Sequence, residues 1–178
     1  MAKQYKVLKQ KDIDFIQEQK LFYLASCSGS EVNLSPKGYD SIRVLDESTL
    51  LFMQYPGSGN RTYRDTKEGG EVTLVFNAFV GKPQILRLFC KSEIVERDDE
   101  NFDEYAKMFG EIKNIVRNFF LFRIYAVETT CGEVVPIMEY KEDREEYREW
   151  AIKLDKKGKL EQYNADTFTP VDLSKVDA

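Results

Sequence analysis

Alternating apolar and polar positions along the chain predict a series of short β-strands. Six segments are rich in β-branched and aromatic residues and are bounded by residues that favour turns. We expect strands at Leu21–Cys27, 31–35, Thr49–Tyr55, Glu71–Phe76, Ile85–Glu96 and Phe119–Glu128. Turns at Ser28-Gly29-Ser30 and Gly81-Lys82-Pro83 would join neighbouring strands into hairpins.

Other segments repeat their apolar residues with helical spacing. A first helix is expected from Asp12, a residue type that caps helices, to about Gln19. Two further helices are expected where apolar residues recur at i, i+3, i+4 and i+7. These residues are Phe102, Tyr105, Ala106 and Phe109 in one segment, and Tyr147, Trp150, Ala151 and Leu154 in the other.

Strands joined by short turns and flanked by amphipathic helices predict a mainly β fold with helices around it. We expect a small six-stranded β-barrel with the helices packed outside, although the pattern alone also fits a two-layer α+β sandwich. With 42% apolar residues the chain can bury a sizeable core, and no Pro/Gly/Ser-rich linker divides it. We therefore expect one domain over residues 1–178, with a helical tail from about residue 141.

Charge and hydropathy narrow the class of protein. The chain has 31 acidic and 26 basic residues, which alternate through most of its length and give a net charge of −5. Such a surface lacks the concentrated basic patch that nucleic-acid binding needs. No apolar run is long enough for a signal peptide or a membrane span. We expect a cytoplasmic protein that binds neither nucleic acid nor membrane.

The inventory of reactive side chains excludes several kinds of chemistry. The chain contains no histidine, which removes Ser-His-Asp and Cys-His catalysis, histidine-zinc hydrolysis and histidine ligation of haem. Its three cysteines, Cys27, Cys90 and Cys131, lie far apart without a CxxC spacing, so neither a disulfide framework nor a zinc site is expected. Chemistry must therefore come from carboxylates, Lys, Tyr, Cys or a bound cofactor.

The segment PGSGNRT, residues 56–62, is the first candidate site. Its glycines allow a tight loop with exposed backbone, and Asn60, Arg61 and Thr62 begin an expected helix. Free N–H groups, a guanidinium fork and a hydroxyl at one place suit a phosphate. The segment matches neither a Walker loop nor a dinucleotide fingerprint. An ordinary turn before a surface helix is the alternative interpretation.

The segment NLSPKGYD, residues 33–40, is the second candidate. Ser35 and Lys37 flank Pro36, and Gly38 leaves the backbone open just after a strand. Taken alone, this could be a plain strand exit with a solvated lysine. Both segments lie at strand ends and both offer a cation with a hydroxyl, so adjacent strands could bring them together around one anion.

Other conspicuous residues have structural explanations at least as good as functional ones. Arg87 stands inside an apolar strand, where it is either a buried ligand-binding cation or a residue on a solvated face. Cys131, before Gly132, could line a pocket or be structural. The aromatic residues of the two later helices are expected to pack on the barrel.

Several sequence blocks resemble one known family. LFYLASC, VNLSPKG, SIRVLDESTLLFM, PGSGNRTYRDT and ILRLFCKSEIVE match, in order and spacing, the pyridoxamine 5′-phosphate oxidase-related, FMN-binding split-barrel family over about residues 15–97. CGEVVP (Cys131–Pro136) and Trp150-Ala151 resemble an uncharacterised branch of that family. The resemblance implies a six-stranded split β-barrel.

The resemblance also implies a homodimer that holds FMN in a cleft between its subunits. Basic and polar residues would hold the FMN phosphate: Lys37, Arg61 and Thr62, with Ser35 and Asn60 beside them. Strand-end residues would face the isoalloxazine ring: Pro36, Gly38, Tyr39 and the strand from Phe52 to Tyr55, which includes Gln54. The second subunit would contribute through the segment near Cys131. Because relatives also bind deazaflavin, that cofactor is an alternative.

Two functions follow from such a site. In the first, the protein is an FMN-dependent oxidoreductase that passes electrons between a donor such as NADH or NADPH and a small molecule, with the flavin carrying the chemistry. In the second, it is a non-catalytic flavin-binding carrier, sensor or stress-response module.

Overall fold

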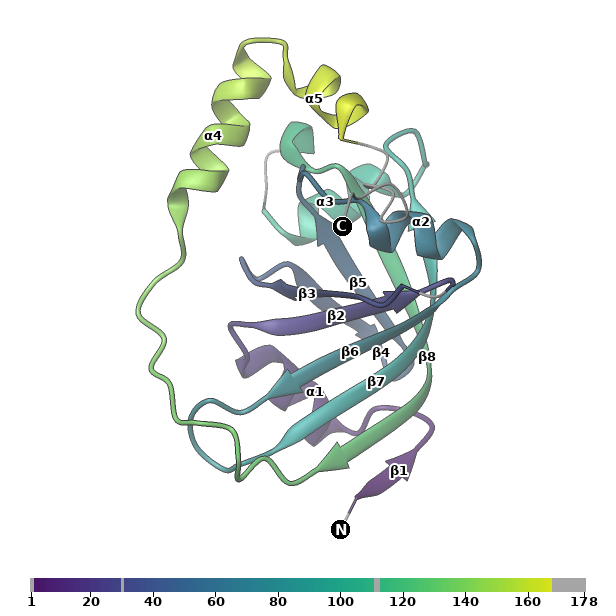
Figure 1. Cartoon of the computed structure of the whole chain (residues 1–178), viewed down its shortest axis with the longest axis vertical. Helices are drawn as coiled ribbons and strands as arrows, with labels where there is room; N and C mark the ends of the chain where they lie inside the picture. The colour runs from purple at the N-terminus through teal and green to yellow at the C-terminus, as the bar shows by residue number, and fades with distance from the viewer. Residues whose placement is uncertain (1, 30, 111–112, 168–178) are drawn as a thin grey trace, which may run out of the picture.

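The strands form one antiparallel sheet that curls into an open barrel (Figure 1). A computed structural model describes residues 2–29, 31–110 and 113–167. Its strands are β1 (Lys3–Tyr5), β2 (Phe22–Cys27), β3 (Asn33–Lys37), β4 (Ile42–Asp46), β5 (Thr49–Gln54), β6 (Glu71–Asn77), β7 (Ile85–Val95) and β8 (Asn118–Thr130). Their order across the sheet is β3-β2-β6-β7-β8-β5-β4, and β1 pairs with β8.

A short connection between the two edges of this sheet explains its curvature. β3 and β4 lie at opposite ends of the strand order, yet only residues 38–41 connect them. Tyr39 and Asp40 both adopt left-handed backbone conformations, with φ of 60° and 51°, which turn the chain sharply. The two edges must therefore approach each other, which gives a barrel that is split between β3 and β4.

Alternation along the strands fills the barrel with apolar side chains. In β2 and β6 every second residue is buried, as expected for strands with one face on a core. Aromatic rings meet inside, where Phe52 stacks on Phe120 and Phe122 with ring centroids 6.0 and 6.1 Å apart. β5 is buried on both faces because its other face lies under a second apolar cluster that contains Phe102 and Phe119.

The helices close the ends and one side of the barrel. They are α1 (Gln10–Glu18), α2 (Arg61–Lys67), α3 (Phe102–Met108), the 3-10 turn η1 (Lys113–Ile115), α4 (Glu145–Lys156) and α5 (Leu160–Asp166). Phe15 and Ile16 of α1 join the barrel core, whereas α3 packs on β8 in the second cluster. The tail helices share a small third cluster around Ala151, Leu160 and Ile115.

The fold confirms the predicted class and corrects some of its details. The described residues form eight strands rather than six, because β1 and β4 were not predicted. The single curled sheet replaces the alternative sandwich. The first helix begins at Gln10 rather than Asp12, and Asp12 caps it from within by accepting a hydrogen bond from the Lys9 N–H at 2.9 Å.

Some predictions fall partly outside what the structure describes. The turn predicted at residues 28–30 includes position 30, and the domain predicted to end at residue 178 includes positions 168–178, all outside the described residues. The tail expected from about residue 141 becomes helical only at Glu145. Residues 131–144 are without helix or strand and run along the side of the barrel to reach α4 (Figure 1).

Candidate functional site

β3 presents a row of polar side chains on the inner face of the barrel edge. The row consists of Asn33, Ser35 and Lys37. Their partners on β2 are Ser26, Leu24 and Phe22 respectively, and these three β2 residues are buried. The alternate residues of β3 face outward, and 63% of the Leu34 surface is exposed. Pro36 is tolerated because β3 is an edge strand and needs no donor on its outer side.

Side-chain hydrogen bonds join this row to α2. The Asn33 amide donates to the Thr62 hydroxyl and to the Ser26 hydroxyl, each at 3.1 Å. The Ser35 hydroxyl donates to the side-chain oxygen of Asn33, Oδ1, at 3.3 Å. Thr62 is buried, with 7% of its surface exposed. The structure therefore brings Ser35 and Thr62, two of the predicted phosphate ligands, together through Asn33.

Arg61, the next predicted ligand, lies in a network of charges beside these hydroxyls. Its guanidinium Nη1 is 2.5 Å from Glu31 Oε2. Arg64 Nη1 contacts the same Glu31 oxygen at 3.1 Å, and Arg64 Nη2 is 2.8 Å from Asp65. α2 has only seven residues, so the site is defined by its side chains rather than by its helix dipole.

Lys37 lies further along the row. It follows Asn33 by four residue steps of extended strand, which is about 13 Å of backbone. Its ammonium sits 6.0 Å above the Phe52 ring, and burial lowers the pKa of the ammonium. Among the described residues no carboxylate lies within ion-pair distance of Lys37. The predicted cations thus lie at two ends of one inner face rather than at a single point.

Gln54 and Asn60 lie at the mouth of the barrel near α2. The Gln54 amide donates to Asn60 Oδ1 at 3.4 Å, whereas Gln54 Oε1 is buried and accepts no hydrogen bond among the described residues. The loop before Asn60 is held from behind by Arg117, whose buried guanidinium donates to the Gly57 carbonyl at 3.0 Å and to the Asn164 carbonyl at 3.0 Å.

Gly38 and Tyr39 face a different neighbour, the C-terminal tail. They line a cleft of about 700 Å³ between the barrel and residues 138–144. The Tyr39 ring contacts Tyr55 at 5.6 Å and Tyr147 of α4 at 6.5 Å, and its hydroxyl donates to the Arg144 carbonyl. Tyr39 therefore connects the split edge of the barrel to the tail.

Cys131 and Arg87 lie away from this cluster. β8 begins opposite Gln54 and ends just before Cys131, so its 13 residues place the exposed thiol roughly 40 Å along the strand from the mouth. Within one chain Cys131 does not join the other candidates. Arg87 lies on the outer face, where it contacts Glu128 at 3.3 Å and Thr130 at 3.0 Å, which supports the solvated-face interpretation.

Four charged residues around the site were not predicted. They are Glu31, Arg64, Asp65 and Arg117. Arg64 follows Arg61 by three residues and so shares its helix face, a spacing that the sequence displays. No sequence pattern marks Asp65, which is fully buried, as the acceptor that fixes Arg64.

The fold and the site together define a split β-barrel with a polar, cationic row on one inner edge. A sequence model of the pyridoxamine 5′-phosphate oxidase family matches residues 8–131, and the chain belongs to this family. It is 33% identical over 138 residues to ustO, a pyridoxamine 5′-phosphate oxidase family protein of Aspergillus flavus. That match covers 74% of this chain but only 55% of ustO.

Solved structures share the fold at low sequence identity. A provisionally named pyridoxamine 5′-phosphate oxidase from Lactobacillus delbrueckii is 23% identical with a TM-score of 0.53, over 69% of this chain and 98% of the other. An FAD-binding protein from Mycobacterium smegmatis is 11% identical with a TM-score of 0.50, over 71% and 97% of the two chains.

Two features are absent from the part of the chain that the structure describes: a membrane-spanning helix and a cluster of metal ligands. No helix there is long and apolar enough to cross a bilayer. No group of three or more carboxylate or thiol side chains is placed there to hold a metal ion.

Proposed function

We propose that this protein binds FMN along the inner face of β3 and uses it for electron transfer. The observation that carries the proposal is Lys37, a largely buried ammonium that lacks a carboxylate partner among the described residues. A buried cation without a counter-ion is costly, and an anionic ligand would compensate it. Family membership and the FAD-binding neighbour support a flavin as that ligand.

The residues of the row suit a flavin monophosphate. At one end Arg61 offers a guanidinium fork and Thr62 a hydroxyl, which would hold the phosphate through charge-assisted hydrogen bonds, and the Asn33 amide orients that hydroxyl. Lys37 would add positive charge further along the same face. The buried Gln54 Oε1, which lacks a donor among the described residues, could accept a hydrogen bond from a ligand at the barrel mouth.

The bound flavin would supply the electron-transfer chemistry, and the chain would bind it, orient it and exclude water. The absence of histidine agrees with a mechanism that relies on a cofactor. We propose a nicotinamide donor and a small-molecule acceptor. The test is the rate of flavin reduction by NADH and NADPH with the FMN-loaded protein. Reduction by neither donor would favour a carrier or sensor instead.

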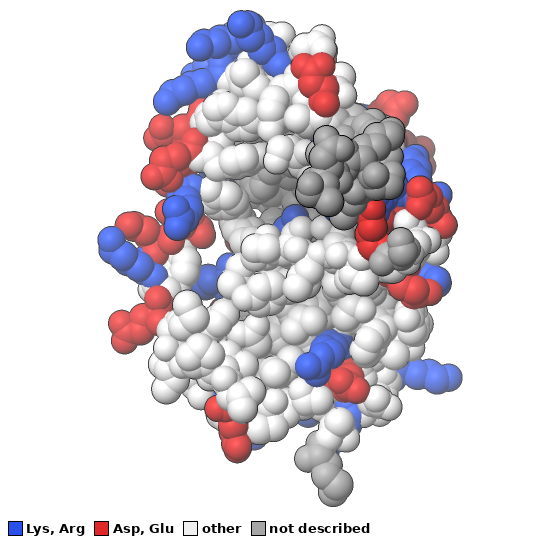
Figure 2. Space-filling view, in the orientation of Figure 1, with Lys and Arg blue, Asp and Glu red and all other residues white. Residues whose placement is uncertain are grey.

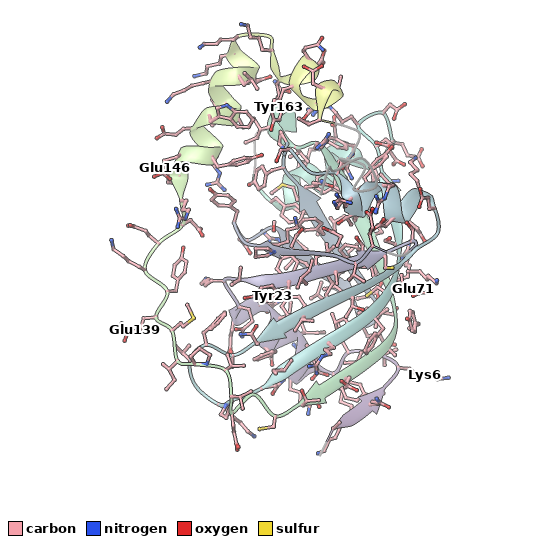
Figure 3. The ribbon with its side chains drawn as sticks, viewed as in Figure 1. Lys6, Tyr23, Glu71, Glu139, Glu146 and Tyr163 are labelled. Atoms are coloured by element: carbon pink, nitrogen blue, oxygen red, sulfur yellow. The ribbon has the colours of Figure 1, made fainter. Side chains whose placement is uncertain are left out.

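We also propose that the protein is a homodimer. The outer face of the sheet carries half-buried apolar side chains in two neighbouring rows. Tyr23 of β2 pairs with Val75 of β6 in one row, and the next row contains Phe89 of β7 and the exposed Leu34 of β3. Figure 2 shows that this face has few charged side chains, and Figure 3 shows Tyr23 on it. A solvated sheet face would be polar, so a partner subunit is the covering that we expect.

Light scattering tests the dimer. One chain has a mass of 20.8 kDa, so the dimer predicts twice that value at micromolar concentration. Leu34→Glu would place a charge on the apolar face without touching the core and should shift the mass toward one chain. A wild-type protein with the mass of one chain would refute the proposal.

The three free cysteines agree with a reducing compartment such as the cytoplasm.

Arg61 provides the decisive test of the phosphate site. Because hydrogen bonds to charged groups contribute about 1.5–3 kcal/mol each, Arg61→Ala should weaken FMN binding at least about tenfold. Arg61→Lys keeps the charge but loses the guanidinium fork, so its affinity for FMN should lie between those of the wild type and Arg61→Ala. Riboflavin, which lacks the phosphate, should bind all three proteins alike, as measured by quenching of flavin fluorescence.

A matched control is Arg123→Ala, which removes an arginine from its exposed ion pair with Glu93, between β8 and β7. It should leave FMN affinity unchanged. If Arg61→Ala changes FMN and riboflavin affinities equally, or changes neither, the phosphate assignment is wrong.

A further inference from the structure

Two arginines of α2 converge on one carboxylate oxygen. Arg61 Nη1 lies 2.5 Å and Arg64 Nη1 lies 3.1 Å from the same atom, Glu31 Oε2. All three side chains are partly exposed, between 21% and 30% of their surfaces. Two guanidinium groups around one anionic oxygen form the arrangement that also binds a phosphate oxygen. In this structure the anion is the protein's own.

The two acidic partners of these arginines differ in how firmly they are held. Asp65 is fully buried, accepts hydrogen bonds from the Ser26 and Ser28 hydroxyls at 2.7 and 2.9 Å, and fixes the other edge of Arg64. Glu31 comes instead from the connection between β2 and β3, and its side chain is 30% exposed. The Glu31 carboxylate can therefore move away from the two arginines while Asp65 keeps Arg64 in place.

We propose that Glu31 is an internal substitute for the ligand phosphate, and that Arg64 is the second arginine of the phosphate site. An incoming phosphate monoester displaces the Glu31 carboxylate from Arg61 and Arg64. The exchange favours the ligand because a phosphate carries about −1.5 to −2 charges and three acceptor oxygens, against one charge on the carboxylate. This inference rests on the proposed FMN site and adds a competing residue to it.

Competition between Glu31 and the ligand predicts the direction in which ligand affinity changes when Glu31 is replaced. Loss of an ordinary positioning residue weakens ligand binding, whereas loss of a competitor strengthens it. Glu31→Gln keeps the shape of the side chain but removes its charge. Because partly exposed ion pairs are individually weak, and two are released here, FMN affinity should rise by about three- to tenfold. Riboflavin affinity should not change, since riboflavin brings no phosphate to the arginines.

The experiment compares FMN, riboflavin and inorganic phosphate on the wild type and Glu31→Gln. Flavin binding is read from fluorescence quenching, and phosphate binding from its competition with FMN. Glu93→Gln is the matched control, because it frees Arg123 from an exposed ion pair that includes no residue of α2 and should leave all three affinities unchanged. The gain for Glu31→Gln should shrink at high salt, which screens exposed charges.

The outcomes separate this inference from the proposed function. Tighter FMN binding with unchanged riboflavin binding supports the competition. If Arg61→Ala weakens FMN binding but Glu31→Gln leaves it unchanged or weakens it, the competition is overturned and the phosphate site stands. FMN binding that depends on neither residue overturns both.

Discussion

Asp65 is the residue whose removal should damage the candidate site most severely. It lies on α2 with none of its surface exposed, and it accepts four hydrogen bonds from three residues. The donors are the Ser26 hydroxyl at 2.7 Å, the Ser28 hydroxyl at 2.9 Å, and Arg64 Nε and Nη2 at 3.0 and 2.8 Å. Since Ser26 also accepts from Asn33, Asp65→Ala would loosen the junction of β2, β3 and α2.

The expected loss of stability follows from these contacts. Breaking a buried charge pair by removing one partner costs about 3–5 kcal/mol. Because the Arg64 side chain is 29% exposed, water can hydrate the arginine that is left behind. We therefore expect a loss near the lower end, about 3 kcal/mol, which is a large share of the ~5–15 kcal/mol that stabilises a typical domain. Asp65→Asn keeps the shape and should cost less.

Urea unfolding followed by circular dichroism measures this loss. With a slope of about 1–3 kcal/mol per molar urea, the midpoint of Asp65→Ala should fall by roughly 1–3 M. Asp14→Ala is the control, since Asp14 is exposed on α1 and bonds only to Gln10 among the described residues. A loss below about 1 kcal/mol for Asp65→Ala would show that the hydroxyl and guanidinium donors find other acceptors, and would refute this reasoning.

Two further predictions concern the far end of β8. Gly132→Ala should destabilise the protein by about 1–3 kcal/mol in thermal unfolding, because a Cβ there would lie 2.7 Å from the Gln84 backbone nitrogen. Gly29→Ala is the control and should cost little stability, because its Cβ would meet nothing within 4 Å. Cys131 is exposed and should react rapidly with a thiol reagent at pH 8, whereas burial raises the pKa of Cys90 to about 12 and should protect it until the protein unfolds. Equal reaction rates for the two thiols, or equal stability of the two glycine variants, would contradict these expectations.

The barrel strands were predictable where one face is buried and the other is not. β2 and β6 alternate without interruption, and their sequences show it. β4 is an edge strand whose residues Ile42, Arg43, Val44 and Leu45 are all half-buried, so its sequence has no alternation to detect. β1 has three residues and depends on its pairing with β8. Such tertiary pairing leaves no local pattern.

The tail shows how the choice of ion-pair partners depends on where a helix starts. The charged run before Trp150 predicts pairs at i,i+4 between Lys141 and Glu145 and between Glu149 and Lys153. The second pair forms at 3.4 Å. The first does not, because the helix begins only at Glu145, and Lys141 contacts Glu142 instead.

For the candidate site, the sequence indicated the right segments but not their partners. NLSPKGYD and PGSGNRT do meet, through Asn33 and Thr62. The pairing of Arg61 with Glu31, however, depends on how the β2–β3 connection folds back over α2, a contact between residues 30 positions apart. Likewise, the extended geometry of β3 separates Lys37 from Asn33, which spacing in the sequence alone does not show.

Lys37 offers a test in which stability and ligand binding change in opposite directions. Burial lowers the pKa of its ammonium below the ordinary value of 10.5, so the folded protein holds this proton less tightly than the unfolded chain. Stability should therefore rise with pH in the window between the lowered folded-state pKa and 10.5, where the unfolded chain binds more protons. At neutral pH the lysine costs stability.

Lys37→Met should relieve that cost, because it replaces the ammonium with an apolar side chain of similar length. Burial of an uncompensated polar group costs about 1–3 kcal/mol, so the free energy of unfolding should rise by about that amount at pH 7. The rise of stability with pH should become smaller at the same time. FMN should bind more weakly to the variant, since the charge that compensates the ligand is gone. If Lys37→Met instead destabilises the ligand-free protein, the ammonium is already satisfied in the fold, and the argument that it awaits an anion is wrong.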